Sequence, residues 1–166
     1  MKMFISGNPM SGKTSLIKRL IEDIGKDKFF GFYTEEIREN KKRIGFKIVT
    51  TYGDEKILSK VDIITPYRVG KYHVIKENLD EVSKYMIENL EKNSKKIIII
   101  DEIGPMEMYS EVFNELIRIV LKKDINLIAT VHRKLLYIVP TYIWLERGNW
   151  WDWYNYIKDK IIKEIL

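Results

Sequence analysis

Apolar residues recur along this chain with two different periods, and segments of the two kinds alternate. Short apolar runs are typical of buried strands, and apolar residues spaced three or four apart are typical of amphipathic helices. The runs predict strands over residues 2–6, 96–101, 125–131 and 142–145. The spaced patterns predict helices over residues 13–24, 79–92, 110–121 and 150–165, with a short helical turn at 133–138. Strands that alternate with helices favour a parallel sheet covered by helices on both faces.

One stretch departs from this alternation. Residues 31–38 and 43–50 have the pattern of two strands joined by the polar residues 39–42, which predicts a β-hairpin. Residues 52–58 add a further short strand, and residues 59–77, which contain Pro and Gly breakers, are predicted to be irregular. We therefore expect an α/β fold in which a mostly parallel sheet carries an inserted antiparallel β-hairpin. The expected organisation is a single domain over residues 1–166.

The composition excludes several classes of protein. Hydrophobic residues make up 45% and charged residues 32% of the 166 residues, and there is no cysteine. No continuous apolar run approaches the roughly 18 residues that a membrane span requires. Nothing at the N-terminus resembles a signal peptide. We therefore expect a cytoplasmic protein without a disulfide framework and without a membrane partner, and the abundance of Ile, Lys and Glu is typical of thermophiles.

A formal net charge of +5 raises the question of nucleic-acid binding. The lysines are nevertheless mixed with acids along the whole chain. The densest basic clusters, 41–43 and 122–123, fall in the predicted hairpin turn and in the last turn of a predicted helix. This pattern favours a solvated surface, so a nucleic-acid partner is not expected. Net positive charge does favour association with polyanionic nucleotides.

The most specific motif is a phosphate-binding loop, G-x-x-x-x-G-K-[ST], between the first predicted strand and the first predicted helix. Its residues are Gly7, Asn8, Pro9, Met10, Ser11, Gly12, Lys13 and Thr14. The glycines let successive backbone N–H groups point at an anion, and the following helix adds its positive end. Lys13 supplies a catalytic charge to the β- and γ-phosphates, and the Thr14 hydroxyl is a ligand for Mg²⁺. The alternative, an ordinary Gly-rich turn, does not explain the strand before the motif and the helix after it.

A second constellation lies at the end of the strand predicted over 96–101. Asp101 ends that strand, where a phosphate-loop protein places the carboxylate that holds Mg²⁺ directly or through water. Glu102 follows it, where a carboxylate polarises a water in line with the γ-phosphate as a general base. Taken alone, the two acids have a second interpretation as solvated residues after a strand. Gly104 completes Asp-x-x-Gly, which also occurs in GTP-driven switches, but the guanine-selecting Asn-Lys-x-Asp motif is missing.

The ends of the remaining strands supply further candidates, because ligands of such sheets bind outside the carboxyl ends of the strands. Arg133 follows the strand predicted over 125–131, and Arg147 follows the one predicted over 142–145. Both are candidate cations for stabilising transition-state charge. The alternative for each is an exposed surface arginine. In the last predicted helix, Trp150 and Trp153 share the apolar stripe that covers the core, whereas Trp151 falls outside it.

The sequence also resembles a known family, the thermophile nucleoside-triphosphatases, whose human member is called cancer-related nucleoside-triphosphatase. The segments that carry the resemblance are 7–14, 31–40, 43–50, 69–72 and 101–107. The resemblance implies a P-loop NTPase fold, a three-layer sandwich related to kinases and RecA-like ATPases. It further implies slow, Mg²⁺-dependent hydrolysis of nucleoside triphosphates to the diphosphate and phosphate, with little base preference.

The resemblance also assigns nucleotide-binding residues. Besides the phosphate loop, it implies a second segment made of Ile97, Ile98, Ile99, Ile100, Asp101, Glu102, Ile103 and Gly104. Family members usually have a glycine where this chain has Met10, a difference that bears on loop packing and turnover.

Three functions remain open from the sequence. The first is a nucleoside-triphosphatase that acts on ATP, GTP, CTP and UTP without an obligate protein partner. The second is a kinase for a nucleoside, nucleotide or other small acceptor, in which the hairpin and residues 59–77 form an acceptor lid. The third is a non-catalytic nucleotide switch or nucleic-acid-associated module, which rests on Asp-x-x-Gly and the basic charge.

Overall fold

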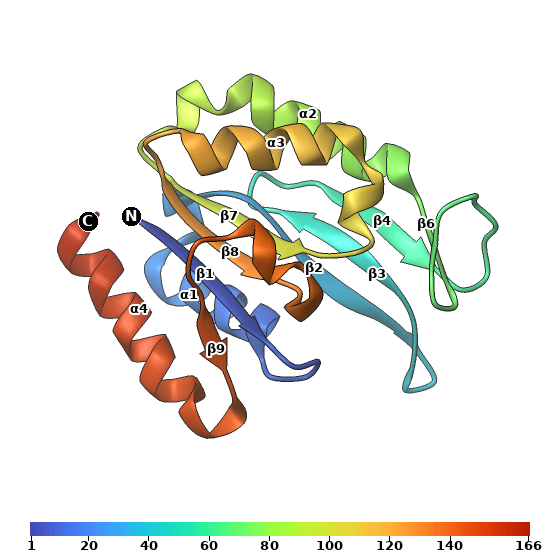
Figure 1. Ribbon diagram of the computed structural model, residues 1–166, viewed down its shortest axis with the longest axis horizontal. Helices are drawn as coiled ribbons and strands as arrows, with labels where there is room; N and C mark the ends of the chain where they lie inside the picture. Colours follow the sequence, from blue (N-terminus) through green and yellow to red (C-terminus); the bar gives the residue numbers. More distant parts are fainter.

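The computed structural model describes residues 1–166 and has all nine strands in one sheet, in the order β5-β6-β4-β3-β2-β7-β8-β1-β9. Helices cover both faces of this sheet (Figure 1). Helix α1 (Lys13–Ile24) packs beside α4 (Trp150–Glu164) on one face, and α2 (Lys76–Asn89) packs beside α3 (Glu111–Lys122) on the other. This is the three-layer α/β arrangement predicted from the alternation of strands and helices.

Five of the nine strands form the parallel part of the sheet, and they include the four strands expected from the apolar runs and the first strand of the predicted hairpin, β2. These strands are β1 (Lys2–Gly7), β2 (Phe29–Glu39), β7 (Ile97–Ile103), β8 (Asn126–Val131) and β9 (Ile143–Leu145). Strand β1 lies between β8 and β9, and β7 lies between β2 and β8. The carboxyl ends of β1, β7, β8 and β9 therefore meet at one edge, which is where the candidate residues were expected.

The other half of the sheet is antiparallel and larger than a hairpin. It consists of β3 (Lys42–Thr50), β4 (Glu55–Lys60), β5 (Arg68–Val69) and β6 (Tyr72–Val74). The predicted β2–β3 hairpin is confirmed, with a tight turn in which Asn40 and Lys41 both have positive φ. Strand β2 continues past its pairing with β7, so the hairpin projects beyond the edge where the parallel strands end.

The prediction that residues 59–77 are irregular was wrong in part, because two short strands lie within this stretch. Strand β6 pairs with β4 through Ser59 and Val74, and β5 turns back on β6 through Val69 and Tyr72. Strands of two or three residues are too short to produce a detectable period of two. Helix α2 also begins at Lys76, three residues before its first predicted residue, because its polar first turn carries no apolar stripe.

Two cores fill the spaces between the sheet and its helices. In β7, Ile98 and Ile100 face α2 and α3, whereas Ile97 and Ile99 face α1 and α4. A strand buried on both faces is therefore apolar at every position, which is why its sequence has no alternation. Short 3₁₀ helices connect the main elements at Lys26–Lys28, Glu91–Asn93, Glu107–Tyr109, Arg133–Ile138 and Arg147–Asn149.

The helix boundaries follow local chemistry. Ser110 caps α3 as expected, because its hydroxyl accepts a hydrogen bond from the backbone N–H of Phe113 at 3.0 Å. Gly25 ends α1, and its N–H donates to the carbonyl of Ile21. In α4, the predicted stripe packs inward and Trp151 is 56% exposed. No helix is long and apolar enough to span a membrane.

Candidate active site

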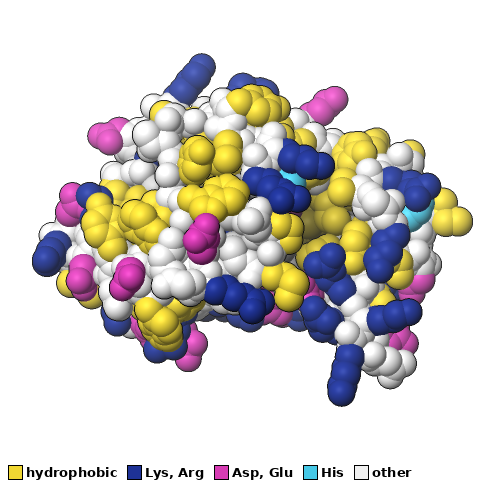
Figure 2. Space-filling view, turned by 60° about the horizontal axis from the view of Figure 1, so that its bottom comes forward, with side chains coloured by type: hydrophobic (Ala, Val, Ile, Leu, Met, Phe, Trp, Pro, Cys, Tyr) yellow, Lys and Arg dark blue, Asp and Glu magenta, His cyan; other side chains and the backbone are white.

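A cleft of about 770 Å³ opens at the edge where the parallel strands end. The phosphate loop and the beginning of α1 form one side of it. The opposite wall comes from the β2–β3 hairpin, from the β5–β6 turn and from the segment after β7. Seen from this edge, the hollow has an apolar floor and is surrounded by Lys and Arg side chains (Figure 2). The cleft therefore brings the phosphate loop together with residues that are far apart in the sequence.

The phosphate loop is tightly packed against the last helix. Gly12 has a φ of 93°, and a Cβ atom there would come within 2.8 Å of the Trp150 ring. The Trp150 indole N–H donates a 2.9 Å hydrogen bond to the Gly12 carbonyl. Trp150 is thus a residue that supports the site, and sequence analysis had placed it only in the core stripe. Its position next to the loop could not be read from the helical period.

Met10 is the one residue other than glycine in this loop that adopts a left-handed backbone, with a φ of 67°. Its side chain points into solvent and is 77% exposed. An L-residue in this conformation brings its Cβ close to the following carbonyl, which glycine avoids. The backbone therefore gives a physical reason for the glycine that the family resemblance implies at this position.

Lys13 and the first turn of α1 present positive charge to the cleft. The ammonium of Lys13 donates hydrogen bonds to the carbonyls of Gly7, at 3.0 Å, and of Asn8, at 3.3 Å, so it lies across the loop. No side chain caps the N-terminus of α1. The first N–H groups of this helix are therefore available to an anion, and the helix dipole favours negative charge there.

Asp101 is almost completely buried, at 1% exposure, and is held by three donors. The Thr14 hydroxyl donates to its Oδ2 at 2.9 Å, the Thr34 N–H donates to the same oxygen at 3.2 Å, and the Thr130 hydroxyl donates to Oδ1. Burial raises the pKa of Asp101, and these hydrogen bonds oppose the increase. Sequence analysis found Thr14 but missed Thr34 and Thr130, because only the strand order β2-β7-β8 places them beside Asp101.

Glu102 lines the cleft, and the peptide bond between it and Asp101 is cis. Burial, together with the negative charge of Asp101, raises the pKa of Glu102 to about 7, although Lys13 opposes the shift. A carboxylate with a pKa near neutral is suited to accept a proton in a reaction at that pH.

A third carboxylate, Glu107, lines the same cleft and is only 4% exposed. A Cβ atom on Gly104 would lie 2.9 Å from an oxygen of Glu102 and 2.9 Å from an oxygen of Glu107, so the glycine separates the two acids. Burial and then the charge of Glu102 raise the pKa of Glu107 well above its usual range. Glu107 lies within a segment that carries the family resemblance. Sequence analysis did not name it as a site residue, because a glutamate in a loop does not by itself indicate a function.

The two candidate arginines occupy different positions. Arg133 lines the cleft and donates to the side-chain oxygen of Asn8 at 3.1 Å. Arg147 does not line the cleft, and its Nε donates to the carbonyl of Met10 at 3.4 Å on the exposed side of the loop. His132 also lines the cleft, and burial together with the charge of Lys13 lowers its pKa.

The second nucleotide-binding segment has a divided role. Its isoleucines, Ile97 to Ile100 and Ile103, are buried in the core and do not line the cleft. They flank Asp101 and Glu102 in β7, and the nucleotide-binding role that the family resemblance implies for them stays a prediction. Only the acidic end of the segment reaches the site.

The donor set fits a hard divalent cation. The Thr14 hydroxyl and the Asp101 carboxylate are hydrogen-bonded to each other, so one ion can be reached by both oxygens. No group of three or more His, Cys, Asp or Glu side chains is arranged to hold a metal. Few protein ligands are what Mg²⁺ requires when phosphate oxygens and water complete its shell.

Comparison with known proteins matches this chain to the NTPase family over residues 2–166. The chain belongs to this family. It is 45% identical over 138 residues to nucleoside-triphosphatase THEP1 of Thermotoga maritima, an alignment that covers 80% of this chain and 75% of the relative. Membership in the NTPase family confirms the resemblance and the predicted enzyme class, a nucleoside-triphosphatase.

Two solved structures of NTPase-family proteins share the fold. The crystal structure of THEP1 from Aquifex aeolicus is 34% identical, with a TM-score of 0.77, and the match covers 100% of this chain and 97% of that one. The solution structure of a human cancer-related nucleoside triphosphatase is 26% identical, with a TM-score of 0.65, and the match covers 98% and 95% of the two chains. The predicted P-loop NTPase fold is confirmed.

Proposed function

We propose that this NTPase-family chain catalyses Mg²⁺-dependent hydrolysis of nucleoside triphosphates to the diphosphate and phosphate, with low base selectivity. One observation carries the proposal. The hydroxyl of Thr14 in the phosphate loop donates to Asp101, and the next residue, Glu102, shares the cleft with Lys13. A phosphate-binding loop, two metal-ligating oxygens and a candidate base therefore surround one space.

Binding depends on the loop and on the start of α1. The backbone N–H groups around Gly12 and the uncapped first turn of α1 donate to the α- and β-phosphates. Lys13 leaves the carbonyls of Gly7 and Asn8 to pair with the β- and γ-phosphates. Thr14 and Asp101 hold Mg²⁺, which neutralises charge on the phosphate oxygens when it is bound.

The hydrolytic step uses Glu102 and Arg133. Glu102 accepts a proton from the attacking water, whose oxygen forms a bond to the γ-phosphorus. The bond from that phosphorus to the β,γ-bridging oxygen breaks, and the diphosphate leaves with the electron pair. Arg133, which lines the cleft beside Asn8, stabilises charge on the γ-phosphoryl oxygens in the transition state.

Low base selectivity is supported by the residues at the end of β8. A guanine-selecting Asn-Lys-x-Asp motif would lie after this strand, but the chain has Thr130-Val131-His132-Arg133 there instead. The contacts described for the cleft involve the loop backbone, the candidate metal ligands Thr14 and Asp101, and the acids Glu102 and Glu107. All of these act on the phosphates or on the acceptor, not on the base. Discrimination by the base is therefore expected to be weak.

The test is phosphate release from ATP, GTP, CTP and UTP with and without Mg²⁺, using the wild type and Glu102→Gln. We expect turnover of all four nucleotides, its loss without Mg²⁺, and a decrease in kcat of about 10²-fold or more in the variant. Glu88→Gln, on the exposed face of α2, is the matched control and should retain wild-type turnover.

Two results would contradict this proposal. Near-normal kcat in Glu102→Gln would remove the assignment of the general base. Tight nucleotide binding without turnover would favour the nucleotide switch, and strong preference for GTP in that experiment would strengthen it further.

A further inference from the structure

The cleft extends well beyond the space around the phosphate loop. The part farthest from the loop, here called the distal half, is lined by Arg43, Phe46, Leu58, Val69, Tyr72 and Met106. These residues come from β3, β4, the β5–β6 turn and the segment after β7. Beyond the γ-phosphate, hydrolysis needs room only for one water, so the distal half is not explained by the proposed function.

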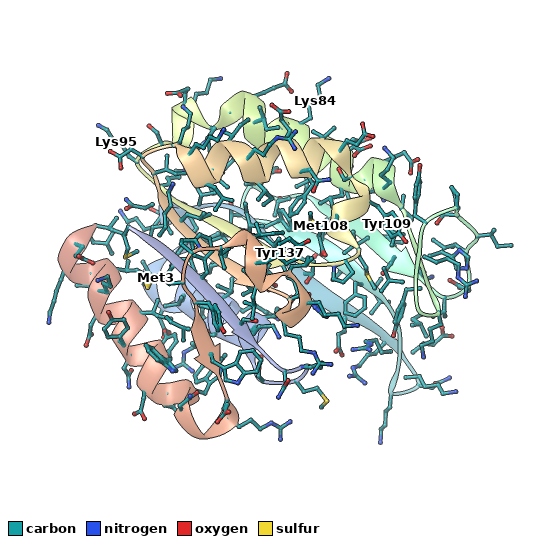
Figure 3. The ribbon with its side chains drawn as sticks, viewed as in Figure 1. Met3, Lys84, Lys95, Met108, Tyr109 and Tyr137 are labelled. Atoms are coloured by element: carbon teal, nitrogen blue, oxygen red, sulfur yellow. The ribbon has the colours of Figure 1, made fainter.

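The distal half is a formed surface held by specific contacts. The rings of Phe46 and Tyr72 pack edge to face, with centroids 5.3 Å apart. The Tyr109 hydroxyl donates to the carbonyl of Arg68 at 2.6 Å, which ties the β5–β6 turn to the segment after β7. Figure 3 shows Tyr109 next to that turn. These contacts fix an apolar wall opposite the phosphate loop.

The two ends of this space carry opposite charge. At the end nearest the phosphate loop lie the carboxyl groups of Glu102 and Glu107, and Glu107 has neither an ionic partner nor a hydrogen bond to another side chain. At the far end, Arg43 shares a single acid, Glu36, with Arg38, which lies beside the cleft and does not line it. An excess of positive charge therefore remains at the far end.

Lys71 adds to this excess. Its ammonium lies 5.6 Å from the centroid of the Tyr72 ring and has no ionic partner. Figure 2 shows Lys and Arg side chains around the hollow on the molecular surface. A ligand that suits the distal half is thus apolar in the middle, anionic at one end and uncharged at the end that meets the two carboxyl groups.

We propose that the distal half binds a second substrate, a ring-bearing alcohol with an acidic group, whose hydroxyl receives the γ-phosphoryl group. The ring packs on Phe46 and Tyr72, and the acidic group pairs with Arg43 and Lys71. This inference uses the same donor nucleotide as the proposed function but a different acceptor.

The transfer is balanced in the same way as hydrolysis. The hydroxyl oxygen of the acceptor forms a bond to the γ-phosphorus while the bond to the β,γ-bridging oxygen breaks. The diphosphate leaves with the electron pair, and the hydroxyl proton passes to Glu102. Water takes the place of the alcohol when no acceptor is bound, which makes hydrolysis the basal reaction of the same site.

The probe is 3′-AMP, which has a planar ring, a phosphate at one end and a free 5′-hydroxyl at the other. Adenosine lacks the acidic group, and 5′-AMP carries its phosphate at the end that would face Glu102 and Glu107. With ATP labelled in the γ-phosphate and Mg²⁺, we measure labelled adenosine 3′,5′-bisphosphate, 5′-AMP and ADP alongside released phosphate. We expect transfer to 3′-AMP to exceed transfer to adenosine or 5′-AMP at least tenfold.

Variants test whether the basic end is responsible. Arg43→Gln/Lys71→Gln removes two charges from exposed positions, so folding should be retained. We expect it to lower the ratio of transfer to hydrolysis at least tenfold. The matched control, Lys84→Gln/Lys95→Gln, removes two exposed charges at the opposite side of the molecule from the phosphate loop (Figure 3) and should leave the ratio unchanged.

The outcomes separate the two proposals. Normal hydrolysis without any labelled bisphosphate would overturn the second substrate and leave the proposed function intact. Equal transfer in the Arg43→Gln/Lys71→Gln variant, or better transfer to 5′-AMP than to 3′-AMP, would also overturn it. Transfer to 3′-AMP without hydrolysis would support the second substrate and contradict the proposed function.

Discussion

The two ends of the cleft are built in different ways. The phosphate end depends on a continuous stretch, residues 7–14, and on acids that directly follow a buried strand. The distal half is assembled from β3, β4 and the β5–β6 turn, which meet only when the antiparallel half of the sheet is formed. The first end has a local sequence signature. The second end exists only as a consequence of strand pairing.

This difference also separates two kinds of specificity. In the proposed function, the phosphate end recognises a group that all nucleoside triphosphates share, through backbone N–H groups and Lys13. The distal half presents side chains, among them Phe46 and Arg43, that would select one partner molecule from many. Side chains of this kind are free to differ between relatives without altering the chemistry at the phosphate end.

The largest effect is expected from Lys13→Ala, which tests how far the phosphate end acts alone. Removing the ammonium should lower kcat/KM for ATP by on the order of 10³-fold, because its charge is lost from the transferred phosphoryl group in the transition state. Steady-state phosphate release measures this. Lys84→Ala on α2 is the control and should remain within twofold of the wild type. A loss below tenfold would show that the loop backbone alone binds the phosphates.

A smaller effect is expected from Arg133→Ala. This arginine lines the cleft, so its loss should lower kcat about tenfold or more with little change in nucleotide affinity. Arg147→Ala is the matched control, because its guanidinium does not line the cleft and donates its hydrogen bond to the carbonyl of Met10. Single-turnover rates of the two variants show which arginine contributes to the chemical step. A larger decrease in kcat for Arg147→Ala than for Arg133→Ala would assign the stabilisation of transition-state charge to Arg147.

The sequence predicted the phosphate end of the cleft nearly completely. The motif at 7–14, the strand before it and the acids at 101 and 102 were placed correctly, because each depends on neighbours within a few residues. The parallel strands and most helix boundaries followed from periodicity for the same reason. The residues missed there, Thr34 and Thr130 at Asp101, depend on which strands lie side by side.

The distal half could not be predicted in the same way. Strands β5 and β6 are too short for a period to emerge, and their place at the edge of the sheet depends on pairing with Ser59 and Lys60 of β4. Glu107 was missed because an acid in a loop is usually exposed, whereas here the chain folds back and buries it between the two ends. Burial of this kind is a long-range property.

Glu107 lies at the boundary between the two ends, and its effect should be on stability. Its pKa in the folded protein is raised well above the ordinary value of 4.5, mainly by burial. Its contribution to stability is therefore fully present below pH 4.5 and is lost as the pH rises through the folded-state pKa. Glu107→Gln should raise the free energy of unfolding at pH 9 by about 1–3 kcal/mol, because no buried charge remains.

The measurement is urea unfolding at pH 5 and pH 9 without nucleotide or metal. The gain from Glu107→Gln should be larger at pH 9 than at pH 5, because the raised pKa favours the protonated carboxyl, which resembles the amide, at the lower pH. Glu88→Gln, at an exposed position, should show no such difference. An equal gain at both pH values would mean that packing, and not charge, causes it.

The smallest expected effect concerns backbone strain, which we compare at the two ends of the cleft. Met10 at the phosphate end and Gly70 in the β5–β6 turn both adopt left-handed backbone, with φ of 67° and 58°. An L-residue with side chain in the left-handed conformation destabilises the folded state by roughly 1–2 kcal/mol relative to glycine. Glycine in turn gives the unfolded chain more conformational entropy, which favours unfolding by about 0.4–1 kcal/mol and so offsets part of this difference. Met10→Gly should therefore raise the free energy of unfolding by about 0.5–1 kcal/mol, and Gly70→Ala should lower it by a similar amount.

Met10→Ala separates backbone strain from the loss of the side chain. It retains the Cβ atom, and the methionine side chain is 77% exposed, so little apolar burial is lost and no gain in stability should follow. A gain in Met10→Gly alone, measured by urea unfolding, places strain in the loop that binds phosphate, while the turn of the distal half already has the glycine that relieves it. Equal gains in both Met10 variants would mean that the side chain itself disturbs the loop, and the two ends would then not differ in backbone strain.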